Sequence, residues 1–114
     1  MMMEILVMDC EECGTFWTTL KSDYKIHFAT TAQRGLNILS EKVGLVFLGI
    51  DLPDMNSMEA LRLIKRDYPS TAVIILSSGG TEELCIEAFR SGARDYIKKP
   101  LKAEEILQKI GILL

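Results

Sequence analysis

Five short apolar runs alternate with segments of helical spacing along the chain. The runs have the length of β-strands and stand at residues 5–8, 26–29, 45–48, 72–76 and 95–97. After each run, apolar residues recur at intervals of three or four positions, which is typical of the buried face of an amphipathic helix. The pattern therefore predicts five strand–helix units in succession.

The strand-like runs also predict how the sheet is covered. The run from Val73 to Leu76 contains no polar residue, which indicates a strand buried on both faces. Parallel strands that alternate with helices are joined by right-handed crossovers. We therefore expect an α/β fold in which a doubly wound parallel sheet lies between two layers of helices, in one domain over residues 1–114.

Local signals mark several helix ends. Thr30 precedes Gln33 by three positions and Asn56 precedes Glu59 by three, which is the spacing of a capping box at a helix N-terminus. Gly92 stands where a residue in the left-handed conformation would end the fourth helix. These residues predict helix starts after Thr30 and Asn56 and a helix end before Gly92.

Charge and run length exclude several classes of function. Thirteen Lys and Arg residues against sixteen Asp and Glu residues give a net charge of −3, and no basic run is longer than Lys98-Lys99, so we expect no nucleic-acid partner. The apolar runs are far shorter than the roughly 20 residues of a membrane span, so we expect no membrane contact. No signal peptide precedes the first strand, and the three cysteines are an odd number, which favours reduced thiols in the cytoplasm.

Chemically useful side chains stand at the predicted strand ends. Ligands of an open parallel sheet bind outside the carboxyl ends of its strands. Asp9 and Cys10 end the first strand, Gly49 the third, Ser77 the fourth and Lys99 the fifth. A carboxylate, a hydroxyl and an ammonium group at one edge suit a phosphoryl group or another anion near a metal.

Four stretches in this order, spread over almost the whole chain, make it similar to a known family. They are Ile5-Leu-Val-Met-Asp9, Asp51-Leu-Pro-Asp-Met55, Ile75-Leu-Ser77 and Gly92-Ala-Arg-Asp-Tyr-Ile-Lys-Lys-Pro-Leu101. At these residues the chain resembles the receiver domain of bacterial two-component response regulators. The resemblance implies a flavodoxin-like three-layer sandwich of five strand–helix units, with a parallel sheet of order 2-1-3-4-5.

The resemblance also implies roles for the strand-end residues. In the family, an acidic pair after the first strand helps to hold magnesium, and an aspartate after the third strand accepts phosphate. Asp9 matches the first acid of that pair, Ser77 the hydroxyl after the fourth strand and Lys99 the lysine that contacts the phosphoryl group. Tyr96 matches the aromatic switch position.

The chain departs from the family at the central positions. Gly49 stands where the acceptor aspartate belongs, and Cys10 stands where the second acid belongs. Glycine has no nucleophile for an aspartyl phosphate. Magnesium prefers hard oxygen ligands, so we expect weak or no binding of Mg²⁺, with Asp9 the remaining candidate ligand. Lys99 is expected to pair with Asp9 or Asp51.

The sequence therefore predicts a non-enzymatic, receiver-like module of a bacterial phosphorelay that works through protein contacts without phosphorylation. The expected partner is a signalling protein, such as a histidine kinase or an output domain. In the family the partner surface lies at residues corresponding to 82–90, 96–98 and 104–110, and a homodimer through that surface is a further option.

Two other functions stay open. One is a phosphoacceptor that uses a substitute carboxylate, Asp51 or Asp9. The other is a thiol redox sensor that uses Cys10-x-x-Cys13, because a thiol at a helix N-terminus has a lowered pKa.

Overall fold

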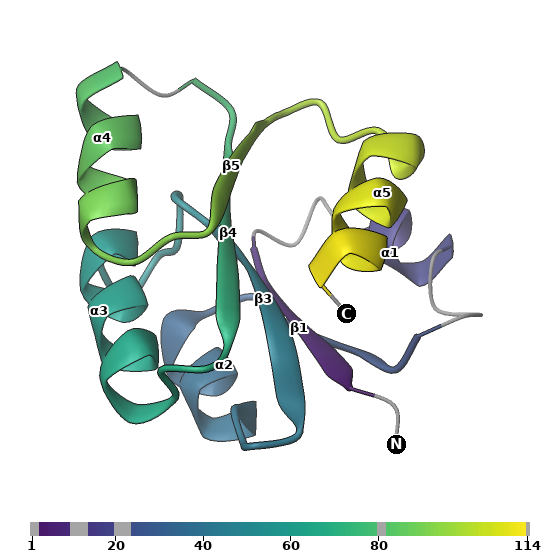
Figure 1. The fold of residues 1–114 in the computed structure, drawn as a ribbon, viewed down its shortest axis with the longest axis horizontal. Coiled ribbons are helices and arrows are strands. Elements are labelled where there is room, and N and C mark those ends of the chain that lie inside the picture. The colour runs from purple at the N-terminus through teal and green to yellow at the C-terminus, as the bar shows by residue number, and fades with distance from the viewer. Residues whose placement is uncertain (1–2, 10–13, 20–23, 80–81, 114) are drawn as a thin grey trace.

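The computed structural model describes residues 3–9, 14–19, 24–79 and 82–113 (Figure 1). The strands are β1 (Glu4–Met8), β2 (Ile26–Ala29), β3 (Val43–Gly49), β4 (Ala72–Ser77) and β5 (Asp95–Lys98). The helices are α1 (Gly14–Thr19), α2 (Ala32–Ile38), α3 (Ser57–Asp67), α4 (Glu82–Arg90) and α5 (Ala103–Leu113). Among the described residues, no helix has the length and apolar character needed to cross a lipid bilayer.

The five strands form one parallel sheet in the order β2-β1-β3-β4-β5. Helices α2, α3 and α4 cover one face of this sheet, and α1 and α5 cover the other (Figure 1). The order reverses beside β1, because the chain runs outward from β1 to β2 and then crosses back to β3. The predicted doubly wound fold and its strand order are confirmed.

The sheet separates two apolar cores. Side chains alternate along each strand, so Leu6 and Met8 of β1 face α2, α3 and α4, whereas Ile5 and Val7 face α1 and α5. All seven residues of β3 are buried. Burial on both faces explains why the central strands appear in the sequence as continuous apolar runs.

Two of the predicted helix ends are confirmed. The Asn56 side chain caps α3 by accepting a hydrogen bond from the backbone N–H of Met58 at 2.8 Å. Gly92 follows α4 with a φ of 109°, a conformation that L side chains rarely adopt. The N–H of the next residue, Ala93, donates to the carbonyl of Ala88 and closes the last turn.

The predicted start of α2 is wrong by one residue. Thr31, not Thr30, is the N-cap, and its side chain accepts a hydrogen bond from the N–H of Arg34 at 3.2 Å. The capping-box spacing indicated Thr30, because Gln33 follows it by three positions. The backbone N–H of Gln33 instead donates to Asp54 from the β3–α3 loop, so a tertiary contact replaces the local one.

Candidate functional site

The predicted strand-end residues meet at one edge of the sheet. Asp9 directly follows β1, Gly49 ends β3, Ser77 ends β4 and Lys99 directly follows β5. Because the strands are parallel, their carboxyl ends lie at the same edge. The backbone N–H of Lys99 donates to the carbonyl of Ser77 at 2.7 Å, which joins the ends of β4 and β5.

An ion pair between Asp9 and Lys99 occupies the centre of this edge. Nζ of Lys99 lies 3.0 Å from Oδ1 of Asp9, although the two residues are 90 positions apart in the sequence. The Asp9 side chain is 1% exposed and that of Lys99 is 16% exposed. A buried carboxylate is costly without a counter-charge, and the ammonium of Lys99 supplies one. Of the two expected partners of Lys99, the structure selects Asp9.

The Asp9 carboxylate lies over Gly49. A Cβ atom on Gly49 would lie 2.2 Å from Oδ1 and 2.8 Å from Cγ of Asp9, distances that non-bonded atoms do not reach. The space in which a side chain at position 49 would begin is therefore filled by a carboxylate from the neighbouring strand.

A buried serine also binds the backbone of Gly49. The hydroxyl of Ser57, at the start of α3, donates to the carbonyl oxygen of Gly49 at 2.6 Å. The next N–H, that of Ile50, donates to the carbonyl of Leu76 on β4 at 3.2 Å. The role of Ser57 could not be predicted from the sequence, because a serine in a first helical turn is common and gives no sign of a contact eight residues away.

Asp54 fastens the β3–α3 loop to α2. Its two carboxylate oxygens accept hydrogen bonds from the backbone N–H groups of Ala32 at 2.8 Å and Gln33 at 3.0 Å. These bonds favour the charged form and lower the pKa of the Asp54 carboxyl below its ordinary value. The loop that follows Gly49 is thus tied to the first turn of a helix on the same face of the sheet.

Asp51 and Ser77 make local contacts at this edge. The exposed Asp51 carboxylate accepts a hydrogen bond from the hydroxyl of Ser78 at 3.3 Å. The hydroxyl oxygen of Ser77 is fully buried and accepts from the N–H of Gly79 at 3.3 Å. Asp51 therefore lies at the surface of the site, whereas Asp9 lies inside it.

Tyr96 points into the protein. Its ring packs against the core on the side of α2, α3 and α4. Its hydroxyl oxygen is buried and has no hydrogen-bond partner among the described residues.

The described residues do not fit the magnesium ion that the resemblance implies. Oδ1 of Asp9 is in contact with an ammonium group, and the carbonyl of Gly49 already accepts the hydroxyl of Ser57. Within the described part of the chain, no three His, Cys, Asp or Glu side chains gather as metal ligands. Cys10 and Cys13 lie outside the described residues.

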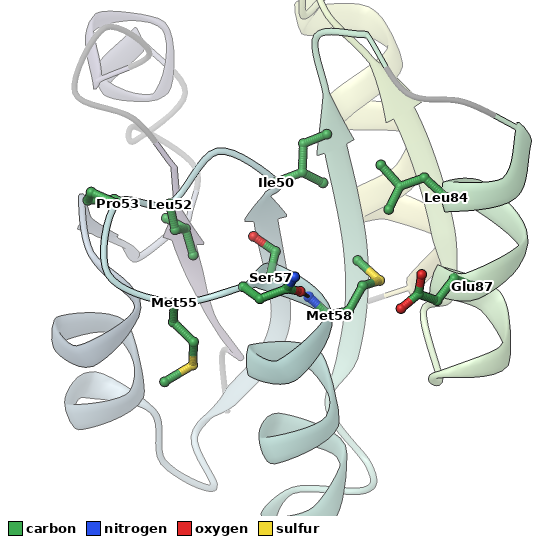
Figure 2. Close-up of a pocket in the computed structure, with 9 residues that line it drawn as sticks. Ile50, Leu52, Pro53, Met55, Ser57, Met58, Leu84 and Glu87 are labelled. Carbon is green, nitrogen blue, oxygen red and sulfur yellow. Dashed lines mark hydrogen bonds between the residues drawn. The ribbon is translucent and has the colours of Figure 1, made fainter.

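A hollow of about 480 Å³ lies beside the site, between the β3–α3 loop, the start of α3 and α4. It is lined by Ile50, Leu52, Pro53, Met55, Asn56, Ser57, Met58, Leu84 and Glu87. Figure 2 shows Leu84 and Glu87 reaching from α4 toward Met58 on α3. The hollow and the site share a wall, since Ser57 lines the hollow and binds the carbonyl of Gly49.

The fold and the strand-end residues define a receiver-type α/β protein. A sequence profile of the response regulator receiver domain matches residues 10–111. The chain therefore belongs to the response regulator receiver family, the receiver domains of two-component systems.

Curated relatives agree with this assignment. The chain is 29% identical over 110 residues to the chemotaxis protein CheY of Listeria monocytogenes, covering 93% of this chain and 92% of CheY. It is 34% identical over 111 residues to a putative NtrX-like response regulator of Rickettsia felis, covering 92% of this chain and 23% of that regulator. The chain thus corresponds to nearly all of the first relative and about a quarter of the second.

Solved structures of receiver domains superpose closely. The BeF3-activated receiver domain of DrrB has a TM-score of 0.88 at 29% identity, covering 99% of this chain and 97% of that one. NtrX from Brucella abortus has a TM-score of 0.88 at 30% identity, covering all of this chain and 27% of that one.

Proposed function

We propose that this receiver domain transmits signals through protein contacts without accepting a phosphoryl group. It is not an enzyme in this proposal, and it acts in the cytoplasm in a two-component pathway. The observation that carries the proposal is the centre of the site, where the carboxylate of Asp9 lies over Gly49 and is paired with Lys99. The resemblance to the family puts Gly49 at the acceptor position.

Chemistry supports the proposal in two ways. Glycine offers no oxygen to attack a phosphoryl donor. Asp9 is buried and in contact with the ammonium group of Lys99. A phosphoryl donor therefore has poor access to its carboxylate, and the neighbouring positive charge makes the carboxylate a weaker nucleophile. Weak or absent magnesium binding belongs to the same proposal, because the cation would compete with Lys99 for Asp9.

The proposed partner surface is built from α4, β5 and α5. Ile86 and Phe89 of α4 are 45% and 47% exposed, and Leu107 of α5 is 38% exposed. Strand β5 is at the edge of the sheet, between these helices (Figure 1). Exposed apolar side chains beside an unpaired strand edge are typical of protein interfaces. A histidine kinase, an output domain or a second copy of the chain is the proposed occupant.

The test is incubation with acetyl phosphate and Mg²⁺, followed by intact-mass measurement. We expect the mass of the wild-type chain to stay unchanged. A gain of one phosphoryl group would overturn the proposal. Parallel reactions of Asp9→Asn and Asp51→Asn would then identify the acceptor, because the gain would be missing from one of them.

A further inference from the structure

We infer that the hollow between α3 and α4 is a docking site for a segment of a partner protein, one that carries an aliphatic side chain beside an arginine or lysine. The inference rests on the proposed function in one respect, namely that the domain acts through protein contacts. It adds a second side of α4 to the side that Ile86 and Phe89 present beside β5 and α5.

Helix α4 presents two different sides to partners. Leu84 and Glu87 are three residues apart and share one side of the helix, which faces Met58 on α3 (Figure 2). Ile86 and Phe89 are also three residues apart. At about 100° of rotation per residue, their side points in nearly the opposite direction. A protein bound over Ile86 and Phe89 therefore leaves the hollow uncovered.

The walls of the hollow are apolar and incompletely packed. Ile50 and Leu84 pack against the core but are only partly buried, and Met58 lines the hollow from α3. Ala88 is the fully buried residue of α4, whereas α3 buries five of its residues. Atoms that face a gap lose dispersion contacts, and an aliphatic side chain inserted from outside would restore them.

The rim of the hollow carries an excess of negative charge. Glu87 lines the hollow, Glu83 lies one helical turn earlier on the same side of α4, and Asp51 follows the lining residue Ile50. All three acidic residues are exposed. Arg62 of α3 contributes one positive charge, at 3.5 Å from Glu87. Charge complementarity therefore favours a basic partner.

The contact between Arg62 and Glu87 does not close the hollow. Both side chains are more than half exposed, and exposed ion pairs contribute little to stability, so a partner's cation can compete for Glu87. The carboxylates lie at the exposed rim, and the apolar side chains form the walls. An apolar centre inside a polar rim is the arrangement of a protein interface. The occupant is therefore a protein segment that offers one aliphatic side chain and one cation.

The test is an amide NMR titration of the wild-type domain with three capped peptides. The sequence Leu-Gly-Arg carries both groups, Leu-Gly-Glu reverses the charge and Gly-Gly-Arg lacks the aliphatic side chain. We expect Leu-Gly-Arg to shift the amide resonances of Ile50, Met58 and Leu84 saturably. It should bind at least about threefold more tightly than Leu-Gly-Glu and at least about fivefold more tightly than Gly-Gly-Arg. No saturable shift, or equal binding of the three peptides, would overturn the inference.

Two variants of α4 with matched controls locate the binding site. Leu84→Trp puts a larger side chain into the hollow and should weaken Leu-Gly-Arg binding at least about fivefold, whereas Ile86→Trp on the other side of α4 should not. Glu87→Gln should weaken binding about twofold, whereas Glu105→Gln on α5 should not. If Leu84→Trp does not fold, the Glu87→Gln comparison decides. Equal affinities of a variant and its control would overturn the inference.

A dilution series without peptide tests a second copy of the chain as the occupant. Shifts of the same amides that depend on protein concentration would overturn the inference in favour of self-association. Failure of the proposed function is distinguishable from failure of this inference. A domain that gains a phosphoryl group and still binds Leu-Gly-Arg contradicts only the proposed function, and an unphosphorylated domain that does not bind the peptide contradicts only the inference.

Discussion

The Asp9–Lys99 pair is held together in a place where isolated charges are costly. Removing one partner of a buried ion pair destabilises a protein more than the intact pair stabilises it, because the remaining charge keeps its desolvation cost. Asp9 is 1% exposed, so water cannot replace the ammonium of Lys99. The pair therefore holds the site in one arrangement, while its net contribution to the free energy of unfolding of the whole domain is small.

Replacing Lys99 tests this directly. Lys99→Met keeps the length of the side chain but removes the cation beside the buried Asp9 carboxylate, and we expect a loss of about 3–5 kcal/mol in the free energy of unfolding. Lys98→Met is the matched control, because the neighbouring lysine is exposed and its loss should change stability by less than about 0.5 kcal/mol. Urea denaturation of both variants measures the difference, and equal losses would contradict the burial argument.

Ser57 is the second residue on which the site depends. Ser57→Ala leaves the buried carbonyl of Gly49 without its 2.6 Å hydrogen bond, and we expect a loss of about 1–2 kcal/mol in unfolding free energy. Ser70→Ala changes the same group at an exposed position and should be nearly neutral. A neutral Ser57→Ala would show that the hydroxyl does not support the Gly49 backbone.

Helix packing gives glycines opposite roles in different elements. Gly35 lies buried in α2, where a Cβ would meet Cγ of Met8 on β1 at 2.5 Å. Gly111 lies exposed in α5, with no atom within 4 Å of such a Cβ. Glycine lowers helix stability by about 1 kcal/mol relative to alanine, so only the contact with Met8 distinguishes the two positions.

Alanine substitution should therefore change stability in opposite directions. Gly111→Ala should stabilise the protein by about 0.5–1 kcal/mol through helix propensity. Gly35→Ala should destabilise it by about 1–3 kcal/mol, because α2 must move away from β1 or Met8 must change rotamer. Thermal melting of the two variants measures both effects, and stabilisation by Gly35→Ala would contradict the close packing of α2.

The Asp54 contact to α2 predicts a pH dependence. Two backbone N–H groups lower the pKa of Asp54 in the folded state, so its contribution is present above the unfolded pKa, near 3.8, and is lost as the pH falls through the folded value. The stability difference between wild type and Asp54→Ala should be full at pH 7 and shrink below about pH 4. A difference that does not change between pH 7 and pH 3 would contradict this.

The sequence predicted the architecture of the whole molecule well, because alternation and burial on both faces constrain a parallel sheet strongly. The ends of β1 and β5 could be predicted from the same pattern. Asp9 and Lys99 were therefore expected at one edge of the sheet, and Asp9 was one of the two expected partners of Lys99. The position of the Asp9 carboxylate over Gly49 could not be predicted, because it depends on the side-chain rotamer of Asp9. That rotamer depends on contacts with residues at the ends of β3 and β5. Thr31 was missed for a similar reason, because the competing contact of Gln33 comes from a distant loop.

Cooperation between the strand ends makes the site a property of the whole domain. Asp9 follows β1, Gly49 ends β3, Ser77 ends β4 and Lys99 follows β5, so closure of the site requires these four strands to be in place together. A ligand that entered this site would displace the Asp9 carboxylate and disturb several strand ends at once. Backbone amide resonances report such a change at every one of these positions.

The most direct measurement is an amide NMR titration of the wild-type protein with beryllofluoride and Mg²⁺, a combination that mimics a phosphoryl group on a carboxylate. Fluoride alone and Mg²⁺ alone are the controls. Because Gly49 has no carboxylate and Asp9 is held by Lys99, we expect the resonances of Gly49, Ser77 and Lys99 to stay where they are in the controls. Saturable shifts of these resonances with beryllofluoride and Mg²⁺ together would contradict a site that is closed by its own carboxylate.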